Sequence, residues 1–197
     1  SRGGSTLRCR VDGQRGTMAS QMSEADETVS SLYSVKSEQA TMLSFDTYNY
    51  LVHYFGQPQG SMSDDPNGTL GGDYEFIISS ASAERIELKG KKYGNRIVMK
   101  ALTEDQTWKQ YLTKIKKVED DAFFYEYDLL MDGLYTGQMI RSNYTFIVTY
   151  YDEIGKVHQK TVPFMFTADG LRFHEPVTID GQTMQNFVWK NELISVV

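Results

Sequence analysis

Apolar and polar side chains alternate along most of this 197-residue chain, with the period of two that half-buried β-strands produce. In the first half this pattern predicts strands at 7–11, 17–22, 32–35, 41–46, 74–79, 85–89 and 96–102. In the second half it predicts strands at 123–131, 134–141, 144–151, 157–166, 171–174 and 185–189. Turn pairs such as Asp132-Gly133 separate them at spacings of roughly 8–12 residues, which is typical of antiparallel meanders, sandwiches and barrels. The pattern therefore predicts a mainly β fold of antiparallel sheets.

One segment, 103–118, follows the helical period instead. Thr103 and Gln106 have the spacing of a capping box. An apolar stripe follows at helical spacing and comprises Trp108, Tyr111, Leu112 and Ile115. Because no helices alternate with the strands, the pattern excludes a doubly wound parallel sheet. We expect this amphipathic helix to bridge two groups of strands, with Trp108 covering an open edge or end of the sheet.

Three phrases of the first half are echoed, in the same order, in the second half. The first half contains GGSTLRCRVDGQRGTMAS, LSFDTYNYLVHYF and DYEFIISSASAERIEL. The second half contains SNYTFIVTYYDEIGKVHQKTV, FMFTADGLRFHEP and MQNFVWKNELISV. The echo predicts a duplicated β unit, or a lipocalin-like barrel or sandwich, with His53 and His174 at equivalent places. We expect a first β unit at 1–102, a bridging helix and linker at 103–122, and a second β unit at 123–197, or one continuous domain.

Residues 48–55 have two interpretations. Apolar side chains spaced i, i+3, i+4 and i+7 fit one face of a short helix, and they are Tyr48, Leu51, Val52 and Phe55. Asp46 is then the expected N-cap residue. A continued strand is the alternative, because the segment is too short for its periodicity to decide.

Composition limits the possible partners. A formal net charge of −6 and the lack of a basic stripe in the sequence argue against nucleic acid. No apolar run approaches the ~18 residues that cross a bilayer as a helix. The single cysteine, Cys9, cannot form an internal disulfide and is expected in a strand as a small apolar residue. The 13 tyrosines and 10 phenylalanines suit strands, and some could also line a binding surface.

The densest aromatic segment lies beside the longest irregular stretch, 56–72, and together they predict a ligand-binding surface. Loops of this length are uncommon in compact domains unless they carry a function or are disordered. The candidate binding residues are Tyr48, Tyr50, His53, Tyr54 and Trp108. The expected ligand is a glycan, a peptide or a protein partner.

Catalytic and metal chemistry find less support in the residues. His53, His158 and His174 form no pair at metal-ligand spacing, so we expect no metal and no cofactor. Asp46 and His53 could form half of a hydrolytic relay, but no nucleophile motif accompanies them. A hydrolase therefore stays as the alternative from another functional class, and we assign no catalytic residue.

Two charged turns have a simple interpretation and a more specific one. Segment 64–68 (DDPNG) resembles part of a calcium loop, but it lacks the alternating aspartates and closing glutamate and fits a type I turn. Segment 89–92 (KGKK) places three lysines on a hairpin tip, as is typical of a solvated edge. Contact with an anion or a lipid headgroup is the second interpretation of these lysines.

Five phrases carry a family resemblance: SLYSV at 31–35, LSFDTYNYLVHYF at 43–55, GGDYEFII at 71–78, IELKGKK at 86–92 and PFMFTADGLRFHEP at 163–176. In them the chain resembles a family of Bacteroidetes envelope lipoproteins with an uncharacterised domain. The resemblance covers most of 3–197, although Arg10 and Gly16 stand where apolar strand residues are expected. It implies an exported, lipid-anchored precursor longer than this chain, attached to the membrane only through that anchor. It also implies an accessory role in outer-membrane nutrient uptake, and no catalytic residues can be carried over.

Taken together, these observations predict a non-enzymatic binding or accessory module of the cell envelope, in the periplasm or on the outer-membrane surface. The expected partner is a glycan, a peptide or an envelope protein. One alternative is a hydrolase acting on envelope or nutrient polymers. The other is a purely structural partner of an outer-membrane uptake complex.

Overall fold

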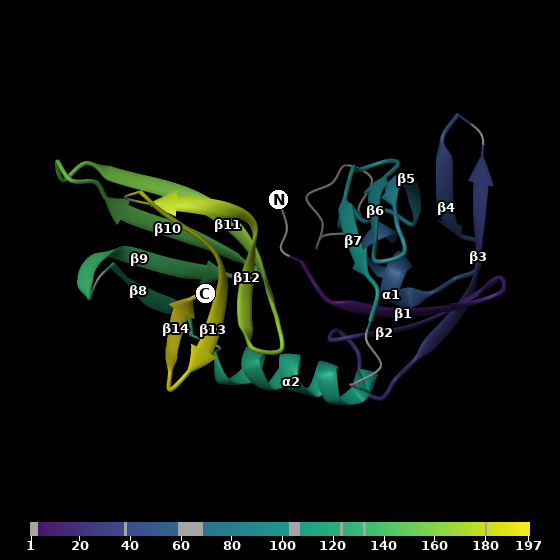
Figure 1. Cartoon of the computed structure of the whole chain (residues 1–197), viewed down its shortest axis with the longest axis horizontal. Helices are drawn as coiled ribbons and strands as arrows, with labels where there is room; N and C mark the ends of the chain where they lie inside the picture. Colours follow the sequence, from purple (N-terminus) through teal and green to yellow (C-terminus); the bar gives the residue numbers. More distant parts are fainter. Residues whose placement is uncertain are drawn as a thin grey trace. The chain divides into compact units, whose positions relative to one another are not determined.

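The computed structural model describes residues 4–37, 39–58, 69–102, 107–122, 124–131, 133–179 and 181–197. The chain divides into two compact units (Figure 1). The first unit is Leu7–Thr107, and the second is Trp108–Val197 together with the N-terminal residues up to Thr6. Each unit contains one seven-stranded antiparallel sheet.

The first sheet is a meander with the strand order β1-β2-β3-β4-β5-β6-β7, so each strand pairs with its neighbours in sequence. Its strands are β1 (Leu7–Asp12), β2 (Arg15–Ser20), β3 (Val29–Ser37), β4 (Thr41–Phe45), β5 (Glu75–Ala81), β6 (Arg85–Gly90) and β7 (Arg96–Lys100). Arg10 and Gly16 are part of regular pairing, opposite Thr17 and Val11 respectively. They therefore do not interrupt the first two strands.

The second sheet is also a meander, with the order β14-β13-β12-β11-β10-β9-β8. Its strands are β8 (Glu126–Met131), β9 (Leu134–Ser142), β10 (Thr145–Tyr151), β11 (Val157–Phe166), β12 (Gly170–Ile179), β13 (Gln182–Lys190) and β14 (Leu193–Val196). Both sheets are curled, like half-barrels. The predicted fold class, mainly β with antiparallel sheets, is confirmed.

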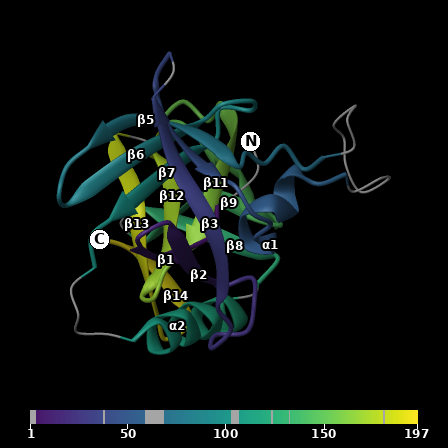
Figure 2. The same ribbon diagram turned by 90° about the vertical axis from the view of Figure 1, so that its right-hand side faces the viewer.

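One long strand in each sheet changes partners midway, and this change accompanies the curl. Strand β3 pairs with β2 through residues 29–32 and with β4 through residues 33–37. Figure 2 shows β3 as one long, bent strand. Strand β11 likewise pairs with β10 up to Pro163 and with β12 from Phe164 onward.

The core of the first unit lies between its sheet and a short helix. That helix, α1 (Tyr50–His53), continues as the 3-10 turn η1 (Tyr54–Gly56), so the helical interpretation of this segment is correct. Leu51 and Val52 of α1 are buried against Met18, Phe76 and Leu88 of the sheet. Cys9, a free thiol, packs at the margin of this cluster, and burial raises its pKa.

The core of the second unit is a line of phenylalanine rings that crosses four neighbouring strands. Phe146 of β10 stacks on Phe164 of β11, with ring centroids 4.3 Å apart. Phe173 of β12 contacts Phe146 at 6.3 Å and Phe187 of β13 at 4.6 Å. Aromatic pairs in such geometries contribute about 0.5–1.5 kcal/mol beyond the area they bury.

The predicted amphipathic helix forms as α2 (Trp108–Asp121), later than the expected 103–118. Its expected cap, Thr103 and Gln106, lies outside the described residues. Leu112 and Ile115 of the predicted stripe are fully buried. Helix α2 lies against β11, and the Tyr144 hydroxyl donates to the Glu119 carboxylate at 2.7 Å. By its contacts α2 is part of the second unit.

The echo between the two halves holds for the architecture but not strand by strand. The phrases that matched correspond to β1–β2 and β10–β11, which are the first two strands of one sheet and the third and fourth of the other. His53 ends α1, whereas His174 lies within β12, so the two histidines are not at equivalent places. Similar turn and aromatic spacing produced the match because both halves are meanders.

Strand β12 is longer than predicted because a bulge carries it past a proline. The expected strand ended at His174, before Glu175 and Pro176 broke the alternation. The pairing of β12 with β13 shifts between Arg172 and Val177 and then continues to Ile179. The Gln185 side chain donates to the carbonyl oxygens of Phe173 and His174, each at 3.3 Å. Proline is tolerated within sheets at such bulges.

In the described part of the chain, no helix combines the length and apolarity that crossing a membrane would require. The longer helix, α2, has 14 residues. A helix that spans a bilayer needs about 20 predominantly apolar residues.

Removing one ring of the phenylalanine line tests its contribution to stability. We expect Phe164→Ala to lower the free energy of unfolding of the second unit by about 3–5 kcal/mol, because a fully buried ring is replaced by a cavity. Urea unfolding followed by near-ultraviolet circular dichroism measures the change. Tyr125→Ala is the control, since Tyr125 is 71% exposed and should change stability by less than about 0.5 kcal/mol. Equal losses of stability in the two variants would contradict the contribution of the phenylalanine line to the core.

Candidate functional site

A buried asparagine fixes the start of α1 and so determines which side chains the helix exposes. The Asn49 carbonyl oxygen Oδ1 accepts a hydrogen bond from the Leu51 backbone N–H at 3.1 Å. Its Nδ2 donates to the Ser31 hydroxyl at 3.2 Å. Leu51 and Val52 are buried in the core, while His53 at the end of the helix is half-buried.

Asp46, the expected N-cap, does not cap this helix. Its backbone N–H donates to the Leu32 carbonyl at 2.9 Å, and its carboxylate lies 3.6 Å from the Lys36 ammonium. Asn49 occupies the cap position because the helix begins three residues later than the pattern indicated.

Three aromatic rings lie together at the C-terminal end of α1, where His53 contacts two exposed tyrosines. The His53 ring lies 5.1 Å from the Tyr74 ring at an interplanar angle of 17°, and 5.4 Å from the Tyr48 ring at 42°. Tyr48 is 59% exposed and Tyr74 is 47% exposed. The His53 Nδ1 lies 2.9 Å from the backbone carbonyl oxygen of Asn49, which fixes the orientation of the ring. We call Tyr48, His53 and Tyr74 the Tyr-His-Tyr stack.

The other predicted binding residues lie elsewhere. Tyr50 packs against the core, where desolvation raises the pKa of its hydroxyl with a further contribution from Glu27. Tyr54 is exposed and meets Phe55 edge to face, with ring centroids 5.2 Å apart. Trp108 begins α2 and is part of the other compact unit. Of the five predicted residues, the stack contains Tyr48 and His53.

Tyr74 is the residue of the stack that sequence reasoning missed. It shares the alternation of Phe76 and Ile78 and was expected as an ordinary strand residue. In the structure it precedes β5, and its backbone carbonyl accepts from the Phe45 N–H at 3.3 Å. No local signal could reveal its contact with His53, because the two residues are 21 positions apart.

The described ends of the long irregular stretch are joined to each other next to the stack. The Gly72 N–H donates to the Phe55 carbonyl at 2.9 Å, and Pro58 and Thr69 form a β-bridge. A Cβ at Gly72 would lie 2.3 Å from the Cβ of Phe55, so only glycine allows this approach. The calcium-like segment 64–68 lies outside the described residues. Among the residues that are described, no group of three or more His, Cys, Asp or Glu side chains could hold a metal ion.

A buried carboxylate next to Tyr74 fixes the β6–β7 turn. Asp73 accepts hydrogen bonds from the backbone N–H groups of Lys92 (2.8 Å), Tyr93 (3.0 Å) and Asn95 (3.2 Å), and from Asn95 Nδ2 (2.7 Å). A Cβ at Gly90 would lie 1.9 Å from the Asp73 carboxylate, so the turn closes tightly on it. Asp73 therefore has a structural role, and it attaches the turn firmly beside the stack.

The lysines of this turn make local contacts. Lys91 forms an ion pair with Glu75 at 3.2 Å, and the Lys92 ammonium lies 4.8 Å from the centre of the Tyr93 ring. Lys89 belongs instead to β6, opposite Arg96 of β7. The three lysines of segment 89–92 consequently do not form one cluster.

A carboxylate–imidazole pair lies at the β10–β11 turn of the second unit. His158 Nε2 lies 2.8 Å from Asp152 Oδ2, and the His158 ring stacks on Tyr150 with centroids 5.2 Å apart. The hydrogen bond to His158 lowers the pKa of Asp152, aided by the backbone N–H of Lys156. In the part of the chain that is described, no hydroxyl or thiol side chain is hydrogen-bonded to His158. The pair that sequence reasoning considered, Asp46 and His53, is not hydrogen-bonded.

Exposed apolar side chains gather at two hairpin tips of the second sheet. At the β8–β9 turn they are Leu130, Leu134 and Tyr135, and at the β10–β11 turn they are Tyr151, Ile154 and Val157. Gly137 of β9 pairs with Tyr150 of β10, which places both turns at the same end of the sheet (Figure 1). Exposed apolar side chains concentrated at one end of a sheet favour an interaction site there.

Removing the Asp73 carboxylate should loosen the turn beside the stack. We expect Asp73→Ala to lower the free energy of unfolding of the first unit by about 3 kcal/mol, because it leaves several partly buried N–H groups without an acceptor. Amide hydrogen exchange at Lys92, Tyr93 and Asn95 should become faster at the same time. Glu84→Ala, which alters an exposed carboxylate in the β5–β6 turn, is the control. Unchanged exchange at the three amides would refute the role of Asp73.

Acid should weaken the second unit partly through Asp152. Because the folded-state pKa of Asp152 lies below its ordinary value of 3.8, its contribution is present above that value and is lost as the pH falls through the folded pKa. We expect Asp152→Asn to be less stable than the parent protein near neutral pH and to lose less stability on acidification. Urea unfolding at pH 6 and at pH 3 measures both. If acidification lowered the stability of both proteins equally, a contribution from Asp152 would be excluded.

The comparisons with known proteins identify a family but no individual relative. No curated protein and no solved structure matches the chain. A family of domains does match, over residues 1–191, in agreement with the resemblance to a family with an uncharacterised domain. The chain thus belongs to the family described as "Domain of unknown function (DUF4302)".

Proposed function

We propose that this protein is a non-enzymatic binding module of the bacterial cell envelope, and that the Tyr-His-Tyr stack binds a glycan. The observation that carries the proposal is the exposure of two tyrosine rings that both contact an oriented histidine. Sugar rings have apolar C–H faces that pack on aromatic rings, while their hydroxyls need nearby polar groups. The tyrosine hydroxyls and the imidazole supply both kinds of contact.

The rigidity of the support favours binding. Asn49 caps the helix that carries His53, and Leu51 and Val52 attach that helix to the core. Asp73 fixes the chain next to Tyr74 through its hydrogen bonds to the β6–β7 turn. A surface that is already ordered loses little conformational entropy when a ligand binds, so more of the contact energy appears as affinity.

The sequence resemblance to Bacteroidetes envelope lipoproteins supports the proposed location. In this proposal the protein is exported and lipid-anchored, and it acts as an accessory component of nutrient uptake at the outer membrane. A glycan-binding surface suits such a role because it retains a polymer near the uptake system without cleaving it.

A second candidate function is assembly with an envelope protein. The observation that favours it is the apolar surface at the β8–β9 and β10–β11 turns, where Ile154 is 87% exposed and Leu134 is 73% exposed. The buried centre of a protein interface is apolar, so side chains of this type suit a surface that a partner covers. This surface is in the second unit, so assembly and glycan binding can coexist in one chain.

Affinity electrophoresis on a panel of neutral polysaccharides tests the proposed glycan binding. We expect at least one polymer to retard the protein, and Tyr48→Ala/Tyr74→Ala to weaken the interaction by about tenfold or more, as loss of two stacking rings predicts. Tyr125→Ala, which removes an exposed ring from the other unit, should bind like the parent protein.

Two results would count against the proposal. Retardation that survives the double substitution would exclude the stack as the binding surface, and no retardation by any polymer would exclude a neutral glycan as its ligand. Release of reducing ends from the same panel, measured across a range of pH, distinguishes the hydrolase alternative, because a binding module shows no turnover at any pH.

A further inference from the structure

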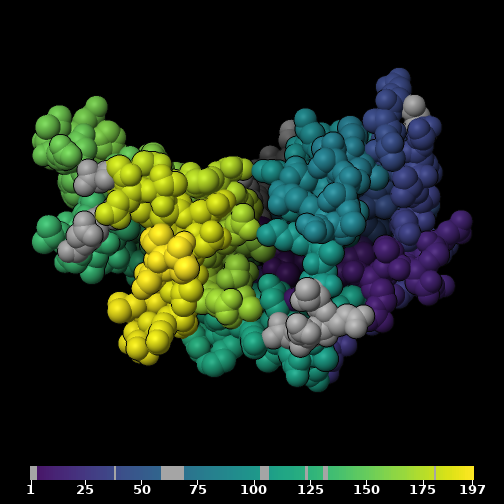
Figure 3. Space-filling view, viewed as in Figure 1, coloured from purple at the N-terminus to yellow at the C-terminus, as the bar shows by residue number. Residues whose placement is uncertain are grey.

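The outer face of strands β6 and β7 is unusually basic for a chain with a net charge of −6. On β6 the side chains of Arg85, Glu87 and Lys89 alternate with core residues such as Leu88. On β7 the outward side chains are those of Arg96, Val98 and Lys100, which alternate with core-packed Ile97 and Met99. The space-filling view shows strands β5–β7 in teal (Figure 3). We call these six outward residues the basic face.

The register of the two strands places like charges directly opposite each other. Arg85 pairs with Lys100 and Lys89 pairs with Arg96, while Glu87 pairs with Val98 between them. Like charges at directly opposed positions destabilise a sheet. All four cationic residues are exposed. An arrangement that costs stability in two cross-strand pairs of the same face indicates a function for the charges.

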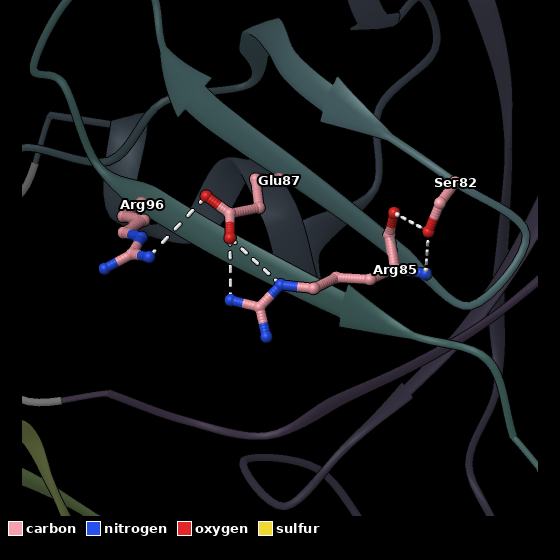
Figure 4. Close-up of polar contacts among 4 residues, drawn as sticks. All are labelled: Ser82, Arg85, Glu87 and Arg96. Atoms are coloured by element: carbon pink, nitrogen blue, oxygen red, sulfur yellow. Dashed lines mark hydrogen bonds and ion pairs between the residues drawn. The ribbon is translucent and has the colours of Figure 1, made fainter.

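Glu87 is the one carboxylate of the basic face, and it orders the two arginines around it. Its Oε1 accepts from Arg85 Nε at 2.9 Å and Arg85 Nη2 at 2.7 Å, and its Oε2 lies 3.6 Å from Arg96 Nη2 (Figure 4). The hydrogen bond from Arg85 is the main cause that lowers the pKa of Glu87. Ser82 fixes the Arg85 backbone, since its hydroxyl contacts the Arg85 N–H at 3.1 Å and the Arg85 carbonyl at 3.2 Å.

Protection of an open sheet edge explains only part of this arrangement. Strand β7 is at the edge of the first sheet, and charged side chains on edge strands prevent pairing with other chains. Strand β6, however, is paired on both sides, by β5 and β7, and it supplies Arg85 and Lys89. Edge protection does not require cations on an interior strand.

We propose that the basic face binds an acidic polysaccharide, whose carboxylate or sulfate groups contact the two cationic pairs. Lys89 is four positions after Arg85, so the two pairs lie about 14 Å apart along the strands. An uncharged part of the polymer then lies over Val98, which is 39% exposed. The basic face is a different surface from the Tyr-His-Tyr stack, and each surface can be disabled by itself.

The position of Glu87 favours a polymer with widely spaced acids over nucleic acid or an anionic membrane. Duplex DNA carries about one negative charge per 1.7 Å of its axis, so some of its phosphates would lie against the Glu87 carboxylate. A membrane surface rich in anionic lipids likewise presents closely spaced negative charges, some of which would lie against the Glu87 carboxylate. Acids spaced along a polysaccharide can contact both pairs and avoid Glu87.

The test measures binding of the whole chain to hyaluronate and to gellan, two acidic polysaccharides whose carboxylates are separated by uncharged sugars, at low and at high salt. We expect binding to at least one of them that weakens with salt, because exposed charges are screened. Lys89→Gln/Arg96→Gln should lower the affinity by about tenfold, as removal of one cationic pair predicts. Lys114→Gln/Lys190→Gln makes the same change in net charge on exposed lysines of the other unit and should leave binding unchanged.

Glu87→Gln gives a second and independent readout. It removes the negative charge between the two pairs, so we expect it to strengthen polysaccharide binding by a few fold and to permit binding of duplex DNA. The proposal is overturned if neither polymer binds, if the Lys89/Arg96 variant binds like the parent protein, or if the parent prefers DNA or phosphatidylserine vesicles. Loss of binding in Tyr48→Ala/Tyr74→Ala but not in Lys89→Gln/Arg96→Gln would assign the polymer to the stack instead.

Discussion

Hydrogen-bonded pairing between consecutive antiparallel strands is the constraint on which the whole structure depends. Every strand in both sheets pairs with the strand before it or after it in sequence. This local pairing fixes the register, and the register assigns alternate side chains to the core or to the outer face. The phenylalanine line of the second unit and the basic face of the first unit both follow from this alternation. The phenylalanine line is on the core side of its sheet, and the basic face is on the outer side of the other sheet.

The two candidate binding surfaces of the first unit are positioned by a small number of buried polar groups. Asn49 fixes the start of α1, and Asp73 attaches the β6–β7 turn close to Tyr74. Both side chains are buried and make several hydrogen bonds, as buried polar groups generally must. They contact no proposed ligand, yet they determine where the exposed aromatic and cationic residues lie.

Sequence reasoning located most strands because alternation and turn residues are local signals. It misplaced Asp46 as the helix cap, since Asp and Asn are both good caps and only the folded backbone shows that the helix begins at Tyr50. It ended β12 at His174, because a bulge stabilised by Gln185 cannot be read from the alternation. It also grouped Trp108 with the aromatic segment, although Trp108 is part of a different compact unit.

The sequence by itself determined the fold class, the turns and the amphipathic helix, because each depends on residues close together in the chain. It also indicated Tyr48 and His53 through their local aromatic density. Only the tertiary structure brought Tyr74 to His53 and set Arg85 opposite Lys100. Those relations join residues 15 or more positions apart, and strand register and chain reversal decide them rather than any local preference.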